Sequence, residues 1–217
     1  MPPLTIKLLW LALASLLVSA LPLPILLNLV LWPIPVGSDG SMGVLGQFMP
    51  WQLATHLLVN SGVSAMLFIG LTLYFFGAML ESTWRPRRYG LFLLACAAGS
   101  TLLQFLASTV AFASGVGPYA PTAGADGVMY GILFACAYLW PDERVMLIIP
   151  PIPMKMQTLV IVLCALNFSF GLWHGGLLSQ FGFLGGLAGA WLHIQYWRGQ
   201  PPFSRKKPPP PKLRIVS

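Results

Sequence analysis

Five acidic residues and three histidines are the side chains of this chain best suited to acid–base chemistry. Asp126, in the run Gly124-Ala125-Asp126-Gly127, is the acid that stands inside a long apolar stretch. Proteolysis by aspartates needs two carboxylates that share one proton. The other acids lie beside basic residues, except Asp39, which would have to fold inward from a loop. The sequence therefore argues against a carboxylate pair.

The histidines and cysteines do not form a recognisable metal or redox motif. His56 and His174 are expected near one end of the bundle and His193 near the other. Two histidines without a third ligand are a poor zinc site. The cysteines have no Cys-x-x-Cys spacing and are expected to be small packing residues: Cys96, Cys136 and Cys164. We predict no metal and no cofactor.

The composition shows what surrounds these side chains. Hydrophobic residues make up 57% of the 217 residues and charged residues only 8%, where a soluble domain has roughly a quarter charged. The uncharged stretches are long enough for about six membrane helices of roughly 20 residues each. The sequence predicts an all-α membrane protein, a six-helix bundle over residues 1–197, with a basic, proline-rich tail over 198–217. The expected spans are 8–32, 63–80, 89–112, 127–140, 157–172 and 181–197.

With the N-terminus in the cytoplasm, these spans place all 12 basic residues on the cytoplasmic side. This distribution follows the positive-inside rule and predicts that both termini are cytoplasmic. Residues 40–62 then form a long outer loop whose aromatic side chains, such as Trp51, are expected in the membrane interface. A signal peptide ending near Ala20 is the alternative for the first apolar run.

The fourth span has only about 14 residues and cannot cross ~30 Å of hydrocarbon by itself. Its N-terminus is therefore expected partway down the bundle, where residues 124–127 face a pocket. Two roles for Asp126 stay open. It can cap the free N–H groups of that helix, or it can pair with a basic or hydroxyl group of another protein, because a carboxylate inside a membrane usually has a partner.

In this arrangement the chain resembles the rhomboid family of intramembrane serine proteases, from Trp51 to Trp197. The matching motifs occur in the family's order and spacing. They are Trp51-Gln52, Thr55-His56, Gly77 with Glu81, the basic loop from Trp84 to Tyr89, Gly124 to Gly127 with Tyr130 and Gly131, the loop from Pro141 to Met156, and Gly182 to Gly186. The resemblance implies that the glycines of the last span pack against the fourth.

The resemblance also shows which catalytic groups are missing. Rhomboid hydrolysis needs a serine nucleophile, a histidine base and donors for the oxyanion. The serine position is held by Asp126 and the histidine position by Phe183, while Ala65 and Ile69 stand at the oxyanion positions. Asn60 replaces a further histidine. The sequence thus predicts a catalytically inactive member with a smaller, drier pocket.

We expect such a protein to bind a transmembrane client or to act as a subunit or assembly factor of a membrane complex. Candidate contact residues are Asp126, Trp51, His56, Phe168, Phe170 and Trp173. The alternative is a divergent intramembrane serine endopeptidase with a non-standard nucleophile, Ser61 or Ser64, and His56 as base. A transporter or channel is disfavoured because no inverted repeat is visible.

The remaining partner predictions concern the bilayer and the tail. Nucleic acid is not expected as a partner, because the basic residues follow the membrane topology. The tail is either a solvated anchor or a site for anionic lipid or a protein partner. Its basic residues are Arg198, Arg205, Lys206, Lys207, Lys212 and Arg214. Together with the resemblance, the topology predicts a multi-pass protein of a bacterial inner membrane.

Overall fold

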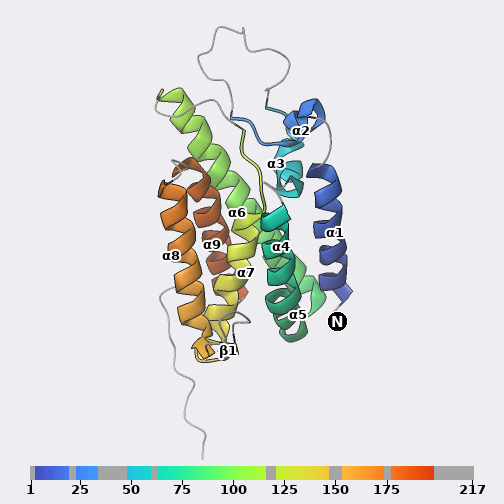
Figure 1. Cartoon of the computed structure of the whole chain (residues 1–217), viewed down its shortest axis with the longest axis vertical. Coiled ribbons are helices and arrows are strands. Elements are labelled where there is room, and N and C mark those ends of the chain that lie inside the picture. Colours follow the sequence, from blue (N-terminus) through green and yellow to red (C-terminus); the bar gives the residue numbers. More distant parts are fainter. Residues whose placement is uncertain are drawn as a thin grey trace, which may run out of the picture.

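The described part of the chain is almost entirely helical (Figure 1). The computed structural model describes residues 3–19, 23–33, 48–59, 63–115, 121–146, 153–173 and 177–197. Several residues of the sequence analysis lie outside these ranges: Asp39, Asn60, Ser61, His174 and the tail 198–217, together with the side chain of Ser64. The elements below are therefore those of the described residues.

The first half of the chain forms one edge of the bundle. Helix α1 (Pro3–Ser19) stands beside a long helix made of α4 (Val63–Thr72), a π-helical turn η2 (Leu73–Gly77) and α5 (Ala78–Thr83). Short helices α2 (Leu23–Leu29), α3 (Gln52–Thr55) and η1 (His56–Leu58) cover one end, at the top of Figure 1.

The second half supplies the centre and the opposite edge. Helix α6 (Pro86–Ala113) runs obliquely through the bundle, and α7 (Asp126–Leu139) lies at its centre (Figure 1). Strands β1 (Arg144–Met146) and β2 (Pro153–Lys155) form an antiparallel hairpin in which Arg144 pairs with Lys155. Helices α8 (Met156–Trp173) and α9 (Leu177–Trp197) complete the bundle.

By length and apolar composition, two helices of the described residues can cross a membrane: Ala65–Thr83 and Pro86–Ala113. The apolar stretches Pro3–Ser15, Asp126–Leu139 and Met156–Gly171 are shorter. Large apolar side chains are exposed along the outer faces of the bundle, for example Leu94 of α6 and Leu192 of α9. Such apolar faces are suited to contact with the hydrocarbon of a membrane. The expected number of six membrane spans stays a prediction.

The first span differs from the expected 8–32 at both ends. Helix α1 begins at Pro3, five residues earlier, and includes Lys7, whose side chain is exposed. At the other end, Leu31 is not helical but pairs with Thr122 through two backbone hydrogen bonds of 2.9 Å. The helical region ends before Leu31 because Leu31 pairs with a segment 91 residues away in the sequence. The apolar pattern around Leu31 does not reveal this pairing.

Glu81 fixes the start of α1. Its buried carboxylate accepts hydrogen bonds from the backbone N–H groups of Leu4 (2.8 Å) and Thr5 (2.6 Å) and from the Thr5 hydroxyl (2.6 Å). The first N–H groups of a helix have no partner inside it, and a negative charge is favourable at that end. Glu81 thus joins the end of α5 to the beginning of α1.

Replacing Glu81 by alanine should destabilise the protein by about 1–3 kcal/mol, because two helix N–H groups and the Thr5 hydroxyl lose their acceptor. The measurement is reversible unfolding in mild detergent. Glu143→Ala is the control, since Glu143 is exposed in the loop after α7. Equal unfolding free energies for the two variants would show that the carboxylate does not hold α1.

Glycines bring α9 against both α6 and α7. A Cβ built on Gly186 of α9 would collide with the backbone of Gly127 in α7, and one built on Gly185 with the backbone of Gly99 in α6. Gly189 meets the backbone of Ala95 in the same way. Glycines at such spacings let helix backbones touch. The family resemblance implied packing on the fourth span, and α9 packs on the third as well.

A methyl group added at this contact should separate the helices. We expect Gly186→Ala to cost about 1–3 kcal/mol of unfolding free energy, the usual range for overpacking. Gly70→Ala is the matched control, because nothing lies within 4 Å of a Cβ at Gly70 in α4. Detergent unfolding curves compare the two, and a Gly186 variant as stable as the Gly70 variant would contradict the close contact.

Candidate functional site

The start of α7 lines a small polar cavity. Its volume is about 50 Å³, which leaves room for a few water molecules. Asp126 and Phe183, the residues at the family's serine and histidine positions, both line it, and so does His56. The remaining lining residues are Ser100, Gln104, Thr122, Ala123, Gly124, Gly127 and Gly182. The pocket expected at the start of the short helix is therefore present.

Asp126 is positioned by the turn before α7. Gly124 has φ +119°, a conformation that favours glycine, and its N–H donates to the His56 carbonyl (3.0 Å). Ala125 is the N-cap residue and makes no side-chain cap bond. Asp126 occupies the first helical turn, where the positive end of the helix dipole favours its negative charge. Protein surrounds its carboxyl group on most sides, although the residue as a whole is exposed.

Phe183 closes the α9 side of the cavity. Only 5% of its surface is exposed. Its ring packs edge-on against the Tyr130 ring, with 4.8 Å between the ring centroids. A phenyl ring cannot accept a proton. The fold therefore brings the two family positions together as a carboxylate and an apolar ring, and these two groups do not make a nucleophile and its base.

His56 is held as a neutral ring. Its Nδ1 lies 2.9 Å from the Gln52 carbonyl oxygen and so carries the proton that it donates. Nε2 is then the acceptor, and the Thr101 hydroxyl lies 3.4 Å from it. Burial lowers the pKa of His56 below its ordinary value of 6.5, because the charged ring loses hydration. Ser61 and Ser64, the alternative nucleophiles, are outside the described side chains.

Two polar residues of α6 complete the cavity and were not predicted from the sequence. The Gln104 side-chain oxygen accepts a 2.7 Å hydrogen bond from the Gly182 N–H, which joins α6 to α9. Its Nε2 is buried and has no protein partner among the described residues. Ser100 lies one turn before it. A signal in the sequence could have identified them. Ser100, Gln104 and Ser108 are spaced four residues apart in an apolar span, and this spacing places them on one helix face.

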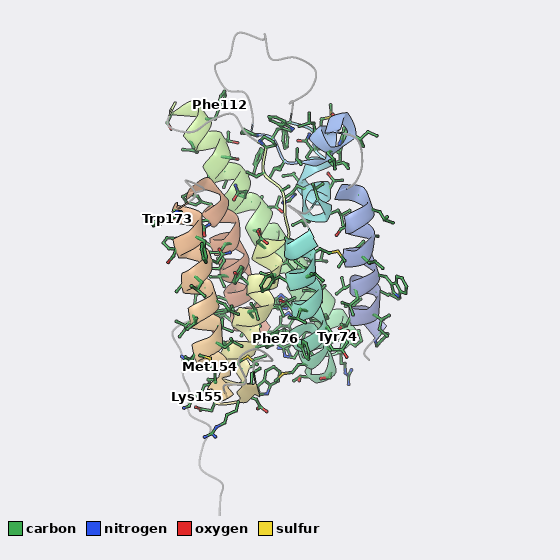
Figure 2. All side chains as sticks on the ribbon, viewed as in Figure 1. Tyr74, Phe76, Phe112, Met154, Lys155 and Trp173 are labelled. Atoms are coloured by element: carbon green, nitrogen blue, oxygen red, sulfur yellow. The ribbon has the colours of Figure 1, made fainter. Side chains whose placement is uncertain are left out.

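The other predicted site residues lie elsewhere. Ile69 lines a separate apolar cavity, and Ala65 is half-buried in α4 without lining the polar one. Trp51 is 54% exposed, and its indole N–H donates to the Asn28 carbonyl at the end of α2 (3.3 Å). The exposed aromatic residues Phe168, Phe170 and Trp173 lie on α8, with Trp173 at the outer edge of the bundle (Figure 2).

Residues 8–207 match a family model described as "Eukaryotic integral membrane protein (DUF1751)". The chain belongs to this family. It is also similar to the rhomboid protease GluP of Bacillus subtilis (strain 168), with 28% identity over 142 residues. That match covers 65% of this chain and 25% of GluP, so the chain spans about a quarter of the relative's length.

The family membership and the GluP match together support a rhomboid-like integral membrane protein that contacts the lipid bilayer. The resemblance suggested by the motifs is thereby confirmed at the level of the relationship. The family is described as eukaryotic, so the expected bacterial inner membrane gains no support from it. Inactivity, client binding and the orientation of the termini stay predictions.

The lowered pKa of His56 predicts how stability depends on pH. As the pH falls through about 6.5, the unfolded chain takes up a proton at His56 before the folded protein does. Stability should therefore be highest above this pH and fall between about pH 7 and pH 5. Thermal unfolding of the wild type and His56→Gln across this range isolates the contribution. If both proteins lost stability equally, His56 would not be the buried neutral group.

Proposed function

We propose that this protein is a non-hydrolytic rhomboid-like membrane protein that holds a transmembrane client or a partner subunit. The observation that carries the proposal is the shared cavity of Asp126 and Phe183. The rhomboid-like fold keeps a polar cavity at the start of α7, but an accessible carboxylate and a phenyl ring stand where hydrolysis needs a hydroxyl and a base. The cavity can still bind a polar group, but its two family positions lack the hydroxyl and the base that the family uses for acyl transfer.

Asp126 is the proposed contact, and its chemistry defines the partner. A carboxylate in an apolar surrounding is stabilised by a basic or hydroxyl group within hydrogen-bond reach. In the described residues of this chain, the cavity is lined by no lysine or arginine. The partner group is therefore a lysine, arginine, serine or threonine of a client helix that approaches the outer end of the bundle.

The end of α8 that carries exposed aromatic residues is the proposed side of approach. Phe170 is 62% and Trp173 87% exposed, and Phe168 is partly exposed on the same helix. Aromatic rings at this end also suit the membrane interface. In the proposed topology both termini are cytoplasmic, which places the polar cavity at the non-cytoplasmic end. The tail of basic residues then faces the cytoplasmic leaflet.

The test is a pulldown of the full chain from its native membrane in mild detergent, with mass spectrometry of the bound proteins. We expect a near-stoichiometric membrane partner that falls at least tenfold in Asp126→Asn, because the amide has the shape of the carboxylate but no charge. Glu143→Gln is the control, since it removes an exposed acid far from the cavity.

Two results would contradict the proposal. A partner retained equally by Asp126→Asn would remove Asp126 as the contact. A protein isolated alone, with shortened membrane fragments that accumulate only in its presence, would favour the second candidate, an endopeptidase with a non-standard nucleophile. His56→Gln should then abolish those fragments, because His56 is the basic ring at the cavity.

A further inference from the structure

A second cavity lies between α1, α4, α6 and α7. Its volume is about 410 Å³, within the roughly 300–1,000 Å³ of small-molecule sites. Apolar side chains make up almost all of its lining. Representative residues are Leu8 and Ala12 of α1, Ile69 of α4, Leu93 and Ala97 of α6 and Met129 of α7. Its occupant is therefore apolar over most of its length.

The cavity opens on the outer face of the bundle. Leu11 of α1 and Leu94 of α6 both line it, although they are 48% and 66% exposed. The opening thus lies between α1 and α6, on a face that meets hydrocarbon in an integral membrane protein. An acyl chain of the bilayer has the shape and polarity to enter there, whereas water finds almost no hydrogen-bond partners inside.

Two basic residues stand one helical turn from lining residues at one end of this cavity. Leu4 and Gly90 line the cavity where α6 begins beside α1, and a Cβ on Gly90 would lie 3.7 Å from Leu4 Cδ2 (Figure 1). Lys7 lies one turn after Leu4, and Arg87 lies one turn before Gly90. Both side chains are exposed.

The positive charges of Lys7 and Arg87 favour a lipid with an anionic headgroup. Long basic side chains at a helix end reach the interface while their stems follow the apolar surface, and each attracts an anionic lipid. Arg88 is occupied elsewhere, because its guanidinium carbon lies 5.1 Å from the ring centroids of both Trp84 and Trp197. Lys7 and Arg87 are thus the pair placed to hold a phosphate at the mouth of the cavity.

We propose that this cavity holds one acyl chain of an anionic phospholipid, whose headgroup lies between Lys7 and Arg87. The proposal does not depend on the client-binding function. The bound chain would also lie behind the polar cavity, because Ala125 and Val128 line the apolar side of the first turn of α7 while Asp126 and Gly127 line the polar side. It would support the turn that carries Asp126.

The test uses the full chain, purified in mild detergent and stripped of lipid, in native mass spectrometry. Dioleoylphosphatidylglycerol and dioleoylphosphatidylcholine are added separately as probes. We expect one phosphatidylglycerol to be retained at least tenfold more strongly than phosphatidylcholine. The double variant Lys7→Gln/Arg87→Gln should lose that preference, and Arg144→Gln, which removes an exposed arginine of the β1–β2 hairpin, should keep it.

A second pair of variants tests the cavity itself. Ala97→Phe fills it and should abolish retention of both lipids, whereas Ala98→Phe, on the exposed face of α6, should not. Equal retention by these two variants would overturn the cavity as the site. Equal binding of the two lipids by the wild type would overturn the headgroup assignment. The charge variants alter only exposed side chains, so they decide the question even if Ala97→Phe does not fold.

Discussion

The contact of α9 with α6 and α7 is the constraint on which the rest of the structure depends. Gly185 and Gly189 let α9 touch the backbone of α6, and Gly186 lets it touch α7 at Gly127. Without side chains between them, the three helices share one packed centre, and α7 can be short because its neighbours shield it from lipid. The same contact sets Gly182 and Phe183 opposite Asp126. The pocket is thus a consequence of how closely these helices pack.

Polar bonds position the remaining parts around this centre. Gln104 joins α6 to α9 through the Gly182 N–H, and the pairing of Leu31 with Thr122 draws the turn before α7 toward the end of α2. His56 belongs to this same end, because its carbonyl accepts the Gly124 N–H. Glu81 holds α1 at the other end. The first turn of α7 is therefore a thin wall, with a polar cavity on one side and an apolar cavity on the other.

The sequence predicted much of the helical pattern, because gaps between charges mark the apolar segments of a membrane protein. The helices α6 to α9 start within four residues of the expected positions. The placing of Asp126 and Phe183 together followed from the family resemblance, not from periodicity. Contacts between distant segments could not be predicted: Glu81 bonds to the start of α1, and Thr122 pairs with Leu31. Ser100 and Gln104 were missed because composition does not say which face of a helix is buried.

We propose that the cavity at the start of α7 binds another membrane protein without cutting it. Photo-crosslinking in the native membrane tests this most directly, with benzoylphenylalanine at Ala123, an exposed residue of the cavity rim, and at Tyr196, an exposed residue near the opposite end of α9. We expect one discrete adduct with an intact membrane protein from position 123 and none of that size from position 196. Identical adducts from both positions, or adducts with shortened fragments from position 123, would contradict it.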